Sequence, residues 1–315
     1  MTGAALFAGF VLVSGVLAPL ALRDARWPER WPRLAVGAWL ALVCTALSGV
    51  TALGLTAAAR LVGYDTFLGV GPGCWTLVWG RPGSWAVVPM AFVALVGVSA
   101  LPGAACVVVL ALVRDAHGRR VHLDEMNRAA GEPPPRPPVR GAAPRVRTVV
   151  VDDPRPAAYC LPGRGGRIVV TSGALRVLSA VSLAAVVEHE LSHLRARHQP
   201  MLVALAALER LPRWVPLLAA ARPAVARLVE MAADDAAARR YGRGAVAQGL
   251  AQLVAASVRS VRLQAAARDV ALRINRLSGR HPATGPWQWV ALTSGLAMTA
   301  IGPVALTAGL WLLCC

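Results

Sequence analysis

Four long apolar runs divide the chain. Residues 4–22, 35–59, 85–113 and 289–313 contain no Asp, Glu, Lys or Arg. A helix needs roughly 20 apolar residues to cross a bilayer. The pattern therefore predicts four membrane-spanning helices, and Pro102 predicts a kink in the third of them.

Composition agrees with a membrane protein. The chain is 56% hydrophobic with a mean hydropathy of +0.54, well above the values of soluble domains. All 33 basic residues are Arg, and 27 of them lie between the third and fourth apolar runs. Because cytoplasmic loops carry the excess of basic residues, we expect an outer N-terminus and a cytosolic location for this long segment. The predicted location is a bacterial plasma membrane.

The net charge of +17 fits this topology. Arginines beside the spans set the orientation of the chain and attract anionic lipid headgroups. We therefore expect the lipid bilayer as a partner and no direct binding of nucleic acid.

The apolar runs define the domain organisation. Residues 1–113 are predicted to form three transmembrane helices with short loops, and residues 288–315 form the fourth. Residues 114–147 are rich in Pro and Arg, which is typical of an extended linker. Residues 148–287 are expected to fold as a cytosolic domain. The predicted fold class is an α-helical multi-pass membrane protein with a cytosolic domain that is mainly α (α+β) and has a small β-sheet.

The chemistry is concentrated in a helical run that begins near Ser179 and holds the sequence H-E-L-S-H at residues 189–193. Positions i and i+4 of an α-helix lie on one face, so His189 and His193 can direct imidazole nitrogens at one point. Two imidazoles suit Zn²⁺, and Glu190 is placed to act as the general base on water. The alternative is a surface helix that carries two unrelated histidines.

A second helix is predicted to begin near Pro223 and to end before Gly242. On this helix Glu230 and Asp234 stand one turn apart on the same face. Glu230 can complete a set of two histidines and one glutamate with a fourth position left open. Asp234 can accept the spare ring N–H of a ligand histidine. Without the histidine pair, both residues would be interpreted as solvated helix charges.

The sequence H-E-L-S-H followed by E-x-x-A-D at residues 230–234 resembles the membrane gluzincin metallopeptidases. This group includes BlaR/MecR-type antibiotic-sensor peptidases, whose layout of spans is similar, as well as HtpX-type and CAAX prenyl-protein proteases. The resemblance implies a gluzincin-like protease domain with one Zn²⁺ per chain. The resemblance assigns the zinc ligands His189, His193 and Glu230. It also assigns Glu190 as the general base and Asp234 as the residue that hydrogen-bonds a ligand histidine.

Two β-branched runs, residues 146–151 and 166–171, are bounded by Pro and Gly and are predicted to pair as a small sheet. In gluzincins an edge strand beside the cleft binds the extended substrate, and strand addition of this kind uses backbone hydrogen bonds. We expect the second run to do so, with a purely structural hairpin as the alternative. The residues of this candidate substrate strand are Arg167, Ile168, Val169, Val170 and Thr171.

Two further residues, Arg273 and Tyr241, are candidates for stabilising the transition state. Arg273 belongs to a helical run predicted over residues 244–277, and a salt bridge or a lipid contact is its alternative role. His198 lies about 140° around the helix from His193 and is expected to lie off the metal-binding face.

The predicted activity is hydrolysis of peptide bonds by a membrane zinc endopeptidase with a cytosolic active site. The expected substrate is a regulatory protein, such as a cytosolic DNA-binding repressor in a signalling pathway. An HtpX-type protease for quality control of membrane proteins is the alternative, and a zinc-stapled scaffold without catalysis is an alternative of another class. A transporter is disfavoured because the four apolar runs contain no ionisable side chains of the kind that mark ion pathways.

Overall fold

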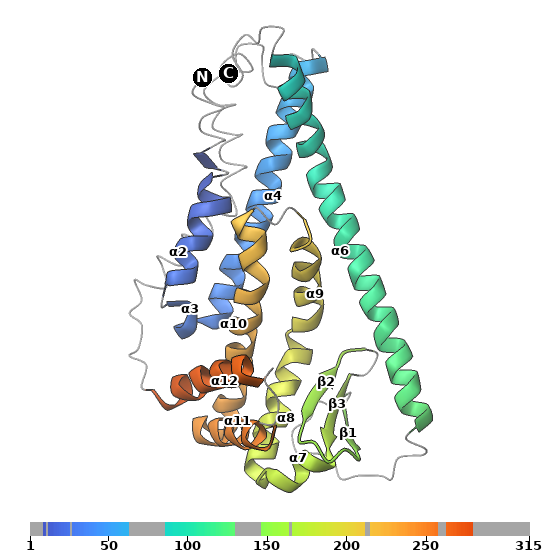
Figure 1. The fold of residues 1–315 in the computed structure, drawn as a ribbon, viewed down its shortest axis with the longest axis vertical. Helices are drawn as coiled ribbons and strands as arrows, with labels where there is room; N and C mark the ends of the chain where they lie inside the picture. Colours follow the sequence, from blue (N-terminus) through green and yellow to red (C-terminus); the bar gives the residue numbers. More distant parts are fainter. Residues whose placement is uncertain are drawn as a thin grey trace. The chain divides into compact units, whose positions relative to one another are not determined.

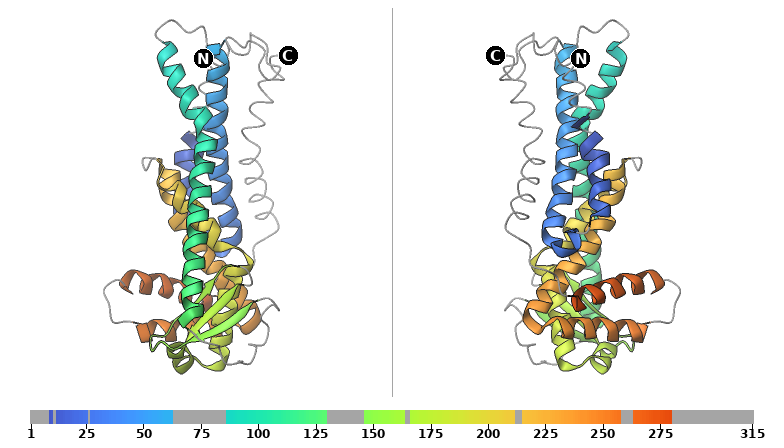
Figure 2. Two further views of the ribbon diagram at one scale, coloured as in Figure 1. Left: turned by 90° about the vertical axis from the view of Figure 1, so that its right-hand side faces the viewer. Right: turned by 90° about the vertical axis from the view of Figure 1, so that its left-hand side faces the viewer.

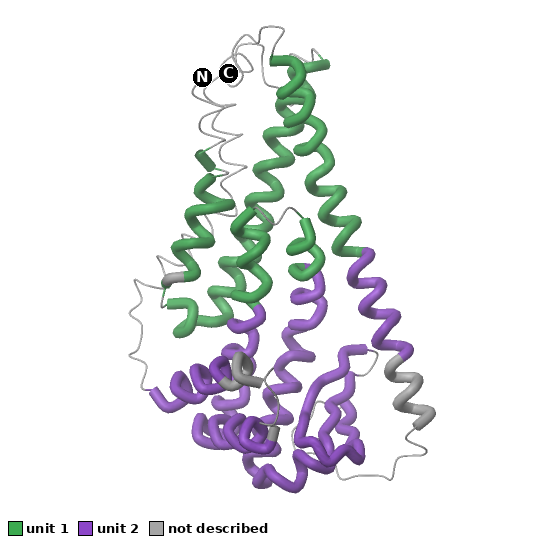
Figure 3. Tube along the Cα trace, in the orientation of Figure 1, with its two compact units in different colours: residues 1–109, 205–225, 283–315 green, residues 110–204, 226–282 purple. Residues whose placement is uncertain are grey.

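The structure is a computed structural model that describes residues 9–10, 12–25, 27–62, 86–129, 146–163, 166–211, 215–257 and 263–279. The chain divides into two compact units, which are coloured separately in Figure 3. Unit 1 comprises residues 1–109, 205–225 and 283–315, and unit 2 comprises residues 110–204 and 226–282.

Two helices cover the second and third predicted spans (Figure 1). The second of them continues to Ala129, so residues 114–129 of the predicted extended linker are helical. These helices, α4 (Pro32–Val62) and α6 (Val87–Ala129), both contain stretches long and apolar enough to cross a membrane. Three shorter elements precede α4: η1 (Val13–Leu17), α2 (Ala18–Asp24) and α3 (Trp27–Arg30). The fourth predicted span lies outside the described residues. The described part of the chain therefore holds two candidate membrane helices, and the count of four stays a prediction.

α4 and α6 touch at a pair of glycines. A Cβ atom placed on Gly54 would lie 2.3 Å from the Cα of Gly97, and one placed on Gly97 would lie 2.4 Å from the Cα of Gly54. The two backbones are therefore in direct contact, as small residues permit in pairs of membrane helices. Ala57, Met90 and Ala94 form a buried cluster between the same helices.

The prediction that the second site-bearing helix begins near Pro223 is wrong. This helix is α10 (Pro216–Tyr241), and Pro223 lies inside it. The residues before Pro223 are mainly Leu and Ala, which favour a helix, and a proline within a helix removes only one backbone hydrogen bond. The predicted end is confirmed, because Gly242 follows with a φ of 84°, the left-handed conformation that commonly ends a helix.

Unit 2 contains a three-stranded sheet in the order β1-β3-β2. β1 (Arg147–Val151) and β3 (Arg167–Thr171) pair in parallel, which confirms that the two β-branched runs form a sheet. β2 (Ala158–Leu161) pairs antiparallel with the other side of β3. The alternative of a hairpin between the two predicted strands is wrong, because these strands run parallel.

β3 is the central strand, so the prediction that it binds substrate along a free edge is wrong. Its backbone is paired with β1 on one side and with β2 on the other. The free edges of the described sheet belong to β1 and β2. β2 escapes prediction because its sequence, A-Y-C-L, contains no β-branched residue. The residues to which this correction applies are Arg167, Ile168, Val169, Val170 and Thr171.

The sheet of unit 2 packs against helix α8 (Ala180–Arg195). Its N-terminus is capped by Ser179, whose Oγ accepts a hydrogen bond from the backbone N–H of Ser182 at 3.2 Å. Leu191 and two valines of α8 pack in one buried cluster with Ile168 and other apolar residues of the sheet. This packing fixes the rotation of α8 and therefore the direction of its polar face.

The other helices of unit 2 are α7 (Ser172–Val177), α9 (His198–Leu208, whose end belongs to unit 1), α11 (Arg243–Ser257) and α12 (Leu263–Ser278). α11 and α12 lie side by side in both views of Figure 2. The single helical run predicted over residues 244–277 is thus two helices. The fold as described is mainly helical with one small sheet.

Candidate metal centre

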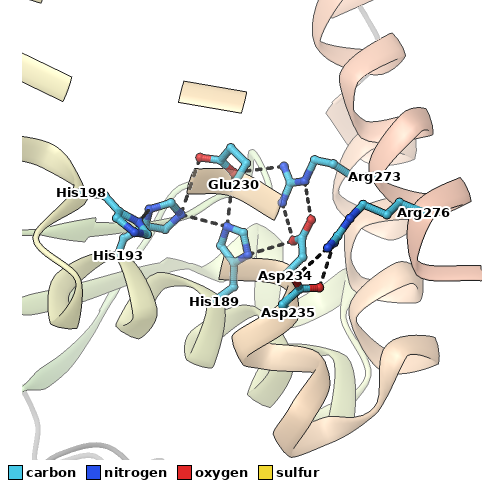
Figure 4. A network of polar contacts seen from close by, with 8 residues as sticks. All are labelled: His189, His193, His198, Glu230, Asp234, Asp235, Arg273 and Arg276. Atoms are coloured by element: carbon cyan, nitrogen blue, oxygen red, sulfur yellow. Dashed lines mark hydrogen bonds and ion pairs between the residues drawn. The ribbon is translucent and has the colours of Figure 1, made fainter. Parts of the chain in front are cut away.

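Two helices bring the predicted zinc ligands together (Figure 4). His189 and His193 lie one turn apart on α8, and Glu230 reaches them from α10. Their ligand atoms all lie within 4.8 Å of one another. The ring of His189 is buried by the packing of α8, while the carboxylate of Glu230 is 38% exposed. The cluster is therefore open on the side of Glu230.

The spacing of these donors fits a zinc ion. The Nε2 atoms of His189 and His193 are 3.1 Å apart, and the carboxylate oxygens of Glu230 lie 3.4 and 3.6 Å from them. With zinc–ligand bonds of about 2.0–2.1 Å, two corners of a tetrahedron are roughly 3.3–3.4 Å apart. Three donors at these separations occupy three corners and leave the fourth free.

Asp234 holds His189 from the other side of its ring. The Oδ1 atom of Asp234 lies 3.0 Å from Nδ1 of His189, and the side chain of Asp234 is 1% exposed. An N–H on Nδ1 directed at this carboxylate leaves Nε2 free to bind the metal. The structure thus places Asp234 where the sequence analysis expects it.

Arg273 of α12 connects the two carboxylates. Its Nε and Nη2 atoms donate to Oδ2 and Oδ1 of Asp234 at 2.7 and 2.6 Å, and its Nη1 lies 3.1 Å from Oε2 of Glu230. The salt bridge, which was the alternative to a transition-state role, is therefore what the structure shows. Arg273 thus orients the carboxylate of Glu230, a candidate metal ligand, and that of Asp234, which contacts His189.

Tyr241, the other transition-state candidate, is far from the cluster. It lies eleven residues after Glu230 on the same helix, which is roughly 16 Å along the helix axis. Its ring packs against the buried residues Ala185, Ala237 and Val246. Helix α10 carries Tyr241 away from Glu230, and its transition-state role stays a prediction.

His198 contacts a predicted zinc ligand, and the sequence did not predict this contact. Its Nδ1 lies 2.8 Å from Nδ1 of His193, and the residue is 8% exposed. The predicted direction of His198 holds only if α8 continues to residue 198. In fact the helix ends at Arg195, and Arg197 adopts a φ of 52°, which turns the chain and brings His198 back to His193. His198 is not one of the three candidate ligands. It contacts Nδ1 of His193, the ring nitrogen that does not face the other donors, and so orients that ring.

The sequence of the chain is similar to those of known peptidases. Residues 139–286 match peptidase family M48. We call residues 139–286 the M48 domain after this match. A stretch of 62 residues is 45% identical to a protease HtpX homolog of Thermoplasma acidophilum, and this stretch is 20% of each protein. The chain thus matches about a fifth of the length of that curated relative, and no solved structure gives a significant match.

These matches confirm the predicted relationship to the HtpX-type membrane gluzincins. Family M48 implies a metalloprotease, and the three donors described above form its candidate metal site. The closer resemblance to BlaR/MecR-type sensors stays a prediction.

The charges of the M48 domain are arranged to hold a cation between the two helices. Burial alone would lower the pKa of His189, but the hydrogen bonds and charges of Asp234 and Glu230 outweigh it and raise this pKa to about 9. Burial alone would raise the pKa of both carboxyls, but His189 and Arg273 lower each of them to about 2. Without metal, His189 therefore carries a proton at neutral pH that a zinc ion has to displace.

Glu190 lies in the same small cavity as His189 and Glu230. This cavity has a volume of about 140 Å³ and is also lined by Leu250 and Leu253 of α11. Burial raises the pKa of the Glu190 carboxyl. A carboxylate with a raised proton affinity next to an open metal position is suited to general-base chemistry.

Cys160 of β2 contacts Glu190. Burial, followed by the charge and hydrogen bond of Glu190, raises the pKa of the Cys160 thiol to about 12. The thiol is therefore protonated at neutral pH, and it does not compete for the metal as a thiolate. This contact places the free edge of β2 directly beside the proposed general base.

Proposed function

We propose that the protein is a membrane-embedded zinc endopeptidase whose active site, in the M48 domain, faces the cytosol. The observation that carries this proposal is the spacing of His189, His193 and Glu230 at distances that suit a tetrahedral metal. Glu190 lies in the same cavity. The metalloprotease class of the matched family supports the same conclusion.

The residues present can divide the steps of peptide hydrolysis among them. A zinc ion held by His189, His193 and Glu230 would supply a Lewis acid that polarises the scissile carbonyl. Glu190 accepts a proton from the attacking water as the C–O bond forms. It then delivers this proton to the amine that leaves as the C–N bond breaks. Asp234 keeps His189 in the tautomer that presents Nε2 to the metal.

An extended substrate would add to the free edge of β2. The backbone N–H of Thr171 in β3 donates to the carbonyl of Ala157 at 3.0 Å. Because backbone groups alternate in direction along an antiparallel strand, those of Ala158 and Cys160 point away from β3. Ala158 lines the small cavity with Glu190. We therefore assign to β2 the substrate-binding role that the sequence analysis gave to β3.

Replacing His189 or Glu230 by Ala should remove most of the bound zinc, because two remaining donors cannot complete the site. We expect about one zinc ion per chain in the wild type and a small fraction of that in each variant. The measurement is atomic absorption on the full chain purified in detergent, alongside cleavage of a quenched fluorescent peptide. His117→Ala, an exposed histidine of α6, is the matched control and should keep its zinc. Unchanged zinc content in either site variant rejects that residue as a ligand. Bound zinc without any peptide cleavage by the wild type supports the alternative of a scaffold without catalysis.

The proposed substrate is a regulatory protein, such as a cytosolic DNA-binding repressor in a signalling pathway. The topology behind this proposal has the N-terminus outside a bacterial plasma membrane and the M48 domain inside. It is supported by the 27 arginines between the third and fourth apolar runs. The alternative is quality control of membrane proteins, and the similarity to a protease HtpX homolog favours it.

A comparison of cell proteomes separates these two substrates. Cells that make the Glu190→Gln variant should accumulate one soluble regulator if the first proposal is right, because only its cleavage is lost. They should accumulate many membrane proteins if the alternative is right. Quantitative mass spectrometry of the soluble and membrane fractions provides the measurement. Equal abundance of all proteins in wild-type and variant cells would contradict both.

A further inference from the structure

A second cavity adjoins the predicted zinc ligand His193. Its volume is about 450 Å³, and it is lined by both His193 and Cys160. Leu191 and Leu194 of α8 form part of its apolar wall. The cavity thus adjoins a predicted metal ligand and the strand β2, to whose free edge we assign the substrate.

The rim of this cavity is basic. Arg119, Arg195 and Arg197 line it, and no Asp or Glu is among its lining residues in the described part of the chain. Arg119 pairs with Asp115 of its own helix. Arg195 donates to Glu188 at 2.6 Å. These two guanidinium groups already have carboxylate partners.

Arg197 differs from the other two arginines. Its side chain is exposed, and it has no ion-pair partner among the residues that the structure describes. Its φ of 52° is uncommon for a residue other than glycine, and such backbone strain is more frequent at functional sites. The turn that imposes this φ also brings His198 onto His193, so the position of Arg197 is tied to the metal site.

We propose that this cavity, here called the basic subsite, binds an acidic side chain of the substrate and that Arg197 is its specificity-determining residue. The inference rests on the proposed peptidase function and names the substrate class. Ala158 borders the cavity of Glu190, and Cys160 borders the basic subsite. The two residues are about 6.6–6.8 Å apart along the strand, the length of two residues of an extended peptide. An Asp or Glu one or two positions from the scissile bond, on the side of His193, therefore reaches Arg197.

The interaction of a substrate carboxylate with Arg197 is expected to be favourable and modest in size. A carboxylate placed in the basic subsite gains a hydrogen-bonded partner in Arg197, with no acidic lining residue to repel it. Because Arg197 is exposed to solvent, the gain is that of a well-placed surface ion pair. We expect a Glu peptide to be preferred over its Gln counterpart by about 2-fold to 5-fold.

The test uses the full-length, zinc-loaded protein and pairs of quenched fluorescent peptides that differ only in Glu or Gln at one position. Cleavage sites are located by mass spectrometry, and kcat/KM is measured for each pair. The wild type should prefer Glu at one position on one side of the scissile bond. In Arg197→Asn, which removes the charge and tolerates the left-handed backbone, the ratio should fall to about 1. Arg155→Asn, a change at an exposed arginine outside both cavities, should leave the ratio as in the wild type.

A ratio near 1 in the wild type, or an unchanged ratio in Arg197→Asn, overturns the basic subsite. If the wild type cleaves no peptide, the proposed peptidase function fails instead. Binding then tests the subsite by itself. Fluorescence anisotropy of the same peptides on zinc-loaded Glu190→Gln protein should show the Glu preference, and the Arg197→Asn change in that background should abolish it. Equal binding of Glu and Gln peptides there rejects the subsite as well.

Discussion

Replacing Glu190 by Gln should lower kcat for peptide hydrolysis by about 10²- to 10⁴-fold while zinc stays bound. The amide has nearly the shape of the carboxylate, so the small cavity that Glu190 shares with His189 and Glu230 keeps its packing. What is lost is the ability to take a proton from water and return it to the leaving amine. A change confined to kcat, with zinc content unchanged by atomic absorption, is the expected signature.

The control for this substitution is Glu209→Gln, the same chemical change at a residue that lines neither cavity. Glu209 pairs with Arg222 and belongs to unit 1. We expect its kcat to stay within about 2-fold of the wild type, because loss of a surface ion pair has little effect even on stability. A Glu190→Gln variant that cleaves as fast as this control would show that another group acts as the base.

The metal cluster could be predicted from sequence because its geometry is local. His189 and His193 are one helical turn apart, and so are Glu230 and Asp234, so a helix alone puts each pair on one face. Only the approach of α8 to α10 depends on tertiary structure. A shared metal ion requires that approach, which is why the chemistry of the residues was enough to predict it.

The features of the fold and the site that could not be predicted from sequence depend on how segments distant in the chain pair, or on where the chain turns. The hydrophobic pattern predicted β1 and β3 as strands. It did not predict that β2 pairs with β3, which makes β3 a central strand with no free edge. The contact of His198 with His193 could not be predicted, because it depends on one residue, Arg197, that leaves the helical conformation. Arg273 lies 43 positions after Glu230, and no periodicity connects residues that far apart. Arg273 meets Glu230 because the fold places α12 beside α10.

Replacing Arg273 by Met should destabilise the M48 domain by about 3–5 kcal/mol, the usual effect of removing one partner of a buried ion pair. Arg273 makes two hydrogen bonds to Asp234, whose side chain is 1% exposed. Without the guanidinium, this carboxylate keeps only His189 as a partner and cannot gain water. Zinc affinity should fall as well, because Glu230 loses the contact that orients it. Chemical unfolding and zinc titration of the full chain in detergent measure the two effects.

Arg276→Met supplies a control with nearly identical geometry. Arg276 also lies on α12 and makes two hydrogen bonds of 2.8 and 2.7 Å to one carboxylate of α10, that of Asp235. Asp235, however, is 30% exposed, so water can replace the lost guanidinium. We expect a cost of about 1 kcal/mol there and unchanged zinc affinity. Equal losses of stability in the two variants would show that helix packing, rather than the buried charge of Asp234, determines the cost. Unchanged zinc affinity in Arg273→Met would show that Glu230 is oriented by the two histidines alone.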